Sequence, residues 1–185
     1  MNSIARGFLS GFAATAPMTA VMLVMHRMLP WSERYALPPR KVTMNVADAA
    51  QVKHKMSAPQ RDVATAAAHF GYGAGMGALY AAMEQKVPAP GVAKGIGWGL
   101  IVWSGSYLGF LPALGLHHAA TREPRGRNLL MILAHVVWGA TLGAMVAQTR
   151  NAKARSTSVR SAAFARTPSH GTRRGAAAAH QGSAG

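Results

Sequence analysis

The chain has 185 residues, half of them apolar, a formal net charge of +15 and no cysteine. That length suffices for one ordinary domain, and the lack of cysteine excludes disulfides, thiolate metal sites and cysteine nucleophiles. A strongly basic chain can bind nucleic acid, but no nucleic-acid-binding motif accompanies these basic residues. We therefore expect no nucleic acid as a partner, and anionic lipid head groups are the simpler partner for basic loops.

Four long stretches of the chain contain no Asp, Glu, Lys or Arg. They are residues 7–25, 63–83, 95–116 and 128–149. A helix crosses the hydrocarbon core of a bilayer with roughly 20 apolar residues, so each stretch is long enough. The sequence therefore predicts an all-α integral membrane domain over residues 1–149, with four transmembrane helices at about 4–29, 60–85, 91–116 and 127–149. Buried helices of a soluble protein are the alternative, but they would need an outer shell of amphipathic elements that this chain lacks.

The first uncharged stretch could also be a signal peptide. Arg6 precedes it, and Ala14-Thr15-Ala16 resembles a cleavage site. We favour a retained helix, because the uncharged run continues through Pro17 to Met25.

The connection between the first two predicted helices, residues 30–59, contains Pro38-Pro39. Two prolines interrupt a preceding helix and suit the first turn of a new one. Apolar residues recur at helical spacing over residues 41–56, which predicts a short amphipathic helix at the membrane surface. An ordinary solvated helix fits equally well, because the apolar face is weak.

The last 36 residues differ from the rest in composition. Residues 150–185 contain seven Lys or Arg, no acidic residue and few large apolar residues. Such a segment buries too little apolar surface to fold, so we expect a basic disordered tail.

Two of the predicted helices share a motif. Residues 68–78 and 134–144 both read Ala-His-x-x-aromatic-Gly-Ala-x-x-Gly-Ala. A weaker match between the first and third helices aligns Gly7 with Gly95 and Gly11 with Gly99. Matching helices cross in the same direction, so the pattern indicates a 2+2 parallel internal repeat with its axis along the membrane normal.

Glycines spaced Gly-x-x-x-Gly recur in these helices. In lipid, small residues one turn apart let helix backbones approach closely and gain dispersion contacts. We therefore expect glycine faces to pack against other helices, and such faces also suit a homo-oligomer. The glycines assigned to helix packing are Gly73, Gly77, Gly139, Gly143, Gly95 and Gly99.

His69 and His135 are the ionisable residues well inside the predicted helices. Both lie roughly 10–12 Å from a charged end, so they should share a depth, and the cost of exposing imidazole to lipid should turn them inward. Three interpretations remain open. Each imidazole could tie its helix to a neighbour by a hydrogen bond. The pair could bind a haem or a metal, or it could line a proton or solute path.

Several of these residues together resemble the YagU-like family of poorly characterised bacterial inner-membrane proteins. The matching residues are Leu37-Pro38-Pro39-Arg40, His69, Tyr80, Glu84, Gly95, Gly99, Pro112, Gly115 and Ala134-His135-Val136-Val137-Trp138. The resemblance covers roughly residues 7–147. It implies a multi-span inner-membrane protein and supplies no settled activity.

The functional hypotheses follow from what the sequence contains and lacks. No nucleophile–base pair, phosphate loop or metalloprotease motif is present, so the leading hypothesis is a non-enzymatic multi-pass membrane protein that needs no cofactor. The alternatives are a small transporter or channel component, and a haem or metal carrier using His69 and His135. Basic residues divide ten and ten between the two sides, so charge does not set the orientation. The family resemblance favours cytoplasmic termini.

Overall fold

The computed structural model describes residues 2–165, and within that range every regular element is a helix. The prediction of an all-α chain is therefore confirmed. Residues 1–150 form one compact unit, and a second unit begins at Asn151. The α-helices are α1 (Ser3–Met28), α2 (Pro38–Ala49), α3 (Ala58–Met83), α4 (Gly91–Ser104), α5 (Leu111–Ala113) and α6 (Arg125–Ala165).

The helix starts follow from local sequence. The Asn2 side chain accepts a hydrogen bond from the Ala5 backbone N–H at 2.7 Å and caps α1. Ser57 and Gln60 form a reciprocal capping box at the start of α3. Prolines occupy the first turn of α2 and of α3, where the missing N–H costs nothing.

The helix in the connection between α1 and α3 is shorter than the predicted amphipathic helix. α2 ends at Ala49 instead of near residue 56, because Gln51 adopts a left-handed φ of 58° that a helix cannot continue through. A 3₁₀ turn, η2 (Lys53–Lys55), fills part of the remainder.

α4 does not run on as a regular helix. It passes into a π-helical segment, η4 (Gly105–Phe110), and then into the short α5, where Pro112 has no N–H to donate. Wider π-type turns accommodate such an irregularity. This segment buries Ser106 and Tyr107, two residues that line the cavity described below.

The predicted tail needs a correction at its start. α6 continues to Ala165, so fifteen residues beyond Arg150 are helical where disorder was expected. Residues 150–165 contain no glycine or proline and are rich in alanine and arginine, which favour helix. The rest of the predicted tail, residues 166–185, lies outside the described residues.

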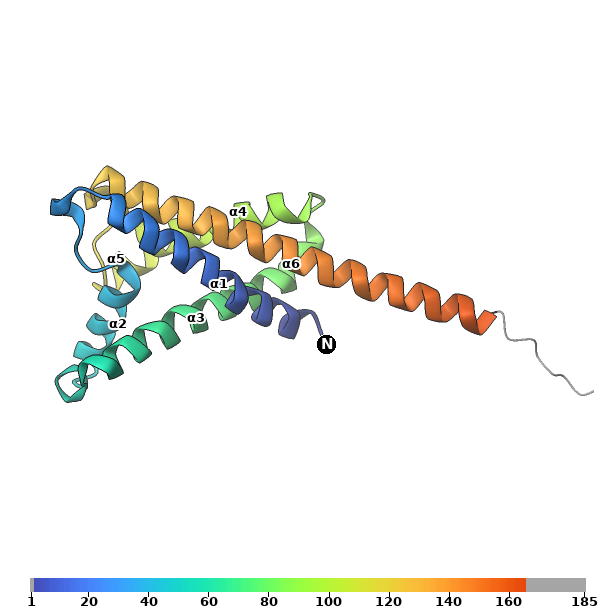
Figure 1. Cartoon of the computed structure of the whole chain (residues 1–185), viewed down its shortest axis with the longest axis horizontal. Coiled ribbons are helices and arrows are strands. Elements are labelled where there is room, and N and C mark those ends of the chain that lie inside the picture. The colour runs from blue at the N-terminus through green and yellow to red at the C-terminus, as the bar shows by residue number, and fades with distance from the viewer. Residues whose placement is uncertain (1, 166–185) are drawn as a thin grey trace, which may run out of the picture. The chain divides into compact units, whose positions relative to one another are not determined.

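The helices pack as two pairs that cross at glycines. A Cβ added at Gly7 or Gly11 would overlap backbone of Gly77 or Gly73, so α1 and α3 touch backbone to backbone. α4 meets α6 in the same way, through Gly91, Gly95 and Gly99 against Gly139 and Gly143. Figure 1 shows α1 crossing α3 near the N-terminus of the chain.

Equivalent glycines make the same contacts in the two crossings, but the α1 and α4 glycines that correspond differ from those aligned in the sequence. A Cβ at Gly7 would meet Gly77 and Ala81, and a Cβ at Gly91 would meet Gly143 and Ala147. Gly7 therefore corresponds to Gly91 and Gly11 to Gly95, one helical turn away from the alignment of Gly7 with Gly95. The motif in α3 and α6 keeps its alignment, because Gly77 and Gly143 occupy equivalent places.

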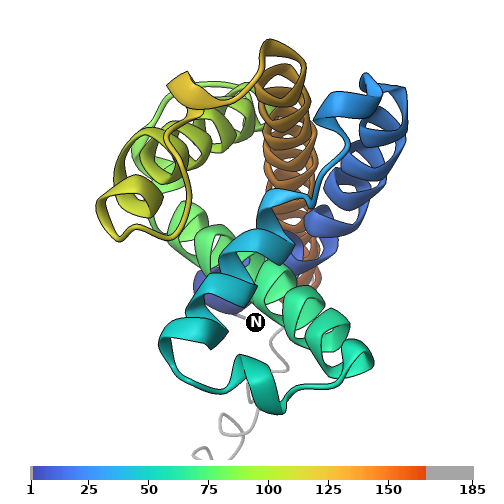
Figure 2. The same cartoon turned by 90° about the vertical axis from the view of Figure 1, so that its left-hand side faces the viewer.

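α6 supplies much of the interior. Leu130, Ala134, Leu142 and Val146 are at most 1% exposed, and Trp138 is 2% exposed. Two helical stretches, α1 and residues Arg125–Ala152, are long and apolar enough to cross a membrane. α2 lies across one end of the bundle, where it packs on α3 (Figure 2).

Candidate functional site

A cavity of about 360 Å³ lies inside the bundle, between α1, α2, α3, η4 and α6. Its wall is mainly apolar and contains no Asp, Glu, Lys or Arg. α2 contributes Pro38, Pro39, Val42, Thr43 and Val46, so the surface helix forms part of the wall. The cavity is partly open and has the size and lining typical of small-molecule sites.

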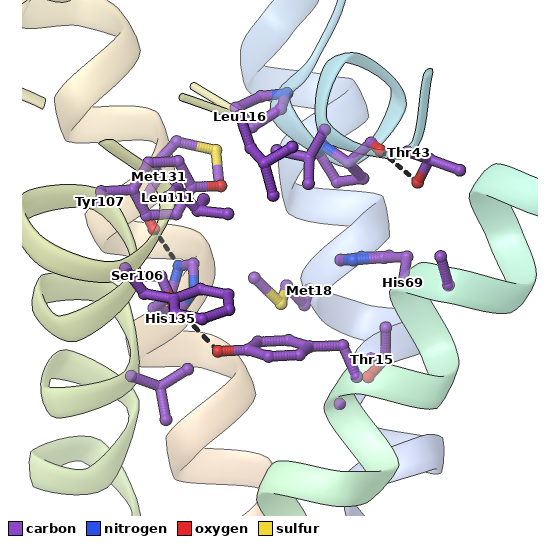
Figure 3. A pocket seen from close by; sticks show the side chains of 18 of the residues that line it. Thr15, Met18, Thr43, His69, Ser106, Tyr107, Leu111, Leu116, Met131 and His135 are labelled. Atoms are coloured by element: carbon purple, nitrogen blue, oxygen red, sulfur yellow. Dashed lines mark hydrogen bonds between the residues drawn. The ribbon is translucent and has the colours of Figure 1, made fainter. Parts of the chain in front are cut away.

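Both histidines singled out in the sequence line this cavity. His69 extends from α3 and His135 from α6, with Met18 of α1 between them in the view of Figure 3. His135 is 5% exposed, and His69 is half-buried. Neither side chain therefore points away from the bundle.

The hydrogen bonds of the two histidines differ. His135 Nδ1 lies 2.8 Å from the carbonyl oxygen of Met131 one turn earlier. A carbonyl only accepts, so Nδ1 carries the proton and Nε2 of the neutral ring is left as an acceptor. The Nε2 atom of His69 is buried and has no hydrogen-bond partner among the described residues. The cavity thus presents two imidazole nitrogens that the protein does not satisfy.

The other polar groups of the wall are largely occupied. Thr15 and Thr43 donate to the carbonyls of Gly11 and Pro39. The Tyr72 and Ser106 hydroxyls lie 2.9 Å apart and join α3 to η4. The Tyr107 ring packs edge-on against His135, with centroids 6.0 Å apart, and helps to orient it.

A polar cluster around the buried Arg127 holds the connection that leads into α2. The Arg127 guanidinium donates to the carbonyls of Glu33, Tyr35 and Ala36 at 3.0–3.1 Å. It also lies 3.7 Å from the centroid of the Tyr35 ring and bonds Glu123 at 3.1 Å. Arg127 therefore fixes the chain just before α2 and, through it, the α2 part of the cavity wall.

Two groups in this cluster have shifted pKa values. Burial and the hydrogen bond to Glu123 raise the pKa of Tyr35 to about 12, so its hydroxyl remains a donor at neutral pH. Burial alone would raise the pKa of Glu123, but the Tyr35 hydroxyl, Arg127 and His117 together hold that pKa below its usual value. The carboxylate is thus the stable form of Glu123 in the folded protein.

A second ionic cluster lies where α3 ends. Glu84 lies close to the helix end and is nevertheless only 4% exposed. Its carboxylate lies 2.5 Å from Lys94 Nζ and 3.2 Å from Arg150, which join α4 and α6 to the end of α3. Glu84 is therefore a buried carboxylate. The cation partners explain why Glu84 tolerates burial.

The adjacent histidines His117 and His118 diverge. His117 is buried, with Nδ1 2.7 Å from the His118 carbonyl and Nε2 3.9 Å from Glu123, whereas His118 is exposed. In the described part of the chain, no group of three or more His, Cys, Asp or Glu residues is placed to hold a metal ion.

Comparison with known proteins gives one match. The family described as "Protein of unknown function (DUF1440)" matches residues 19–144. The chain belongs to this family. No curated protein and no solved structure matches the chain.

The DUF1440 match covers both cavity histidines and both ionic clusters except Arg150, but not Gly7 and Gly11. The sequence pattern identified His69 and His135. It missed three other residues that line the cavity, Tyr72, Ser106 and Tyr107. The π-helical segment carries Ser106 and Tyr107, and Tyr72 contacts Ser106 from 34 residues away in the chain. Tyr72 had a sequence signal as the aromatic residue of the shared motif, whereas Tyr107 and Ser106 had none.

Proposed function

We propose that this DUF1440 protein is a non-enzymatic, four-span protein of the bacterial inner membrane, built as two repeated helix pairs that pack on their glycine faces. The observation that carries the proposal is the pair of equivalent glycine crossings, in which backbones touch with no side chain between them. Helices associate in this manner in lipid, where apolar side chains gain little from contact with one another.

The distribution of apolar side chains supports the same proposal. All four long helical stretches expose large apolar residues, which in water would be costly. Examples are Phe8 (48%), Leu79 (45%), Ile101 (60%) and Leu129 (54%). Meanwhile the charged side chains of Glu84, Lys94 and Arg127 lie at helix ends and are paired. A bilayer would cover the exposed apolar residues and leave the charged ends near its surfaces.

Several further features belong to this proposal. The basic connections would contact anionic lipid head groups, and exposed faces of the bundle would allow a homo-oligomer. We infer cytoplasmic termini from the family resemblance.

Single cysteines test the placement in lipid, because the chain has no native cysteine. Ile101→Cys would lie on the lipid face and Gln85→Cys in an exposed turn. In membranes, we expect a water-soluble maleimide to label Gln85→Cys readily and Ile101→Cys only after denaturation. Equal labelling of both variants in native membranes would contradict the proposal.

A second candidate function is ligand binding inside the bundle, as a transporter component or as a haem carrier. The observation that favours it is the presence of His69 and His135 on one cavity. Haem held by two imidazoles gives a Soret band. Haem-replete expression followed by purification tests this form: a Soret band lost in His135→Phe would support haem, and no band would exclude it.

A further inference from the structure

We infer that the cavity binds a neutral, lipid-soluble molecule whose ring-sized head group carries a hydroxyl, and that this molecule enters from the hydrocarbon. The inference rests on ligand binding inside the bundle, in a form other than haem, and on the membrane placement, and it names the class of ligand.

The size and lining of the cavity suit an organic molecule. A volume of about 360 Å³ exceeds what an ion requires and falls in the range of small-molecule sites. Aromatic rings of Tyr72, Tyr107 and Trp138 line it together with Met18 and Met131. Flat rings and flexible thioethers pack well against a ring-shaped ligand.

The charge of the wall indicates a neutral ligand. No Asp, Glu, Lys or Arg lines the cavity, so a charged ligand would have no counter-ion in an apolar surrounding. Burying an unpaired charge there would be strongly unfavourable.

The hydrogen bonding of His135 indicates a hydroxyl on the ligand. Its Nδ1 donates to Met131, which leaves Nε2 as an acceptor in need of a donor. His69 Nε2 lacks a partner among the described residues and lies on the opposite wall (Figure 3). A ligand hydroxyl can donate to His135 Nε2, and an oxygen elsewhere on the ligand ring can form a hydrogen bond with His69 Nε2.

The rim of the cavity indicates the route of entry. Tyr72 of α3 and Phe110 of η4 line the cavity and are 47% and 60% exposed. Tyr72 lies near the middle of the 26-residue α3, so this part of the rim would face the bilayer interior and not its surface. A molecule dissolved in lipid could reach the cavity between these side chains.

A matched pair of probes tests the hydroxyl. The full chain is placed in lipid nanodiscs, with empty nanodiscs as the partition control. Binding of 4-hexylphenol and of its methyl ether, 4-hexylanisole, is then measured by calorimetry. We expect the phenol to bind roughly five- to tenfold more tightly, because only the phenol can donate to His135. Equal affinities in the wild type would overturn the inference.

Three variants identify the site. His135→Phe should bind both probes with equal affinity, whereas His118→Phe, at an exposed position outside the cavity, should keep the preference for phenol. Val42→Trp fills the cavity from α2 and should abolish binding of both probes. It also keeps the test decisive if His135→Phe does not fold. A phenol preference unchanged in His135→Phe, or binding retained in Val42→Trp, would contradict the inference.

These outcomes are separable from failure of the proposed function. Water accessibility of Ile101→Cys in membranes would refute the membrane placement, whatever the binding result. If the wild type binds neither probe while Ile101→Cys is still protected from maleimide, the ligand inference is wrong and the four-span proposal is unaffected.

Discussion

Gly75 and Gly77 lie two residues apart on α3, but a methyl group would meet different surroundings at each. At Gly77 it would overlap the carbonyl oxygen of Gly7 and approach the backbone of Gly11, and at Gly75 it would meet nothing within 4 Å. Backbone cannot rotate out of the way as a side chain can. The α1–α3 crossing therefore requires glycine at position 77 and not at position 75.

We expect Gly77→Ala to lower the free energy of unfolding in detergent by about 1–3 kcal/mol, the usual cost of overpacking. Gly75→Ala should be neutral or should stabilise the protein by up to about 1 kcal/mol, because alanine favours helix. Thermal unfolding of the two variants measures this. Equal destabilisation by both would show that the α1–α3 crossing is not as close as described.

The ionic cluster at Glu84 gives a second residue-level prediction. The side chains of Glu84 and Lys94 are 3% and 6% exposed, so Glu84→Gln leaves a buried ammonium without its carboxylate. Such a loss costs about 3–5 kcal/mol. The control is Asp62→Asn, which breaks an exposed pair with Arg40 and should cost less than about 1 kcal/mol. If Glu84→Gln and Asp62→Asn lower the free energy of unfolding by denaturant to a similar extent, Glu84 is not buried.

At the scale of elements, the connection before α2 depends on the cluster of Arg127, Tyr35 and Glu123. The folded protein lowers the pKa of Glu123, so the ionised carboxylate contributes stability above the unfolded pKa near 4.5. That contribution is lost as the pH falls through the folded pKa. We therefore expect the stability difference between wild type and Glu123→Gln to be present at pH 7 and to shrink as the pH falls below 4.5. Thermal midpoints at several pH values measure it, and a difference that grows in acid would contradict this account.

The positions of the long helices follow from the sequence because charges are costly in apolar surroundings and mark helix ends. α1, α3 and α6 begin within a few residues of the expected starts. The sequence did not predict how the glycines of α1 correspond to those of α4, because several glycines at four-residue spacing permit more than one alignment. Only the backbone contacts show that Gly7 in the α1–α3 crossing is equivalent to Gly91, and not to Gly95, in the α4–α6 crossing.

The candidate site was predictable only in part. Imidazoles inside apolar helices stand out, so the sequence identifies His69 and His135. The π-helical segment that carries Ser106 and Tyr107 comes just before Pro112, which has no N–H to donate, and no sequence pattern predicts it. The burial of Glu84 depends on Lys94 and Arg150, which come from two other helices, so its position near a helix end does not reveal it.

At the scale of the whole molecule, we propose that four helices cross the membrane. Hydropathy and length alone identify two, α1 and the first part of α6. α3 is rich in alanine and glycine, and α4 is interrupted by η4, so neither meets such a criterion. The glycine crossings nevertheless place α3 beside α1 and α4 beside α6, and each pair contains one of these two apolar helices, which supports the proposal that all four cross.

The side of the membrane on which Gln85 lies distinguishes four crossings from two. Single cysteines at Gln51, Gln85 and Thr121, all exposed, are treated in intact cells with a membrane-impermeant maleimide. If four helices cross, Gln85 lies on one side of the membrane, and Gln51 and Thr121 lie together on the other. If only α1 and α6 cross, the whole segment between them stays on one side. We expect Gln85 to be labelled from the side opposite to Gln51 and Thr121, and labelling of all three from the same side would show that α3 and α4 do not cross.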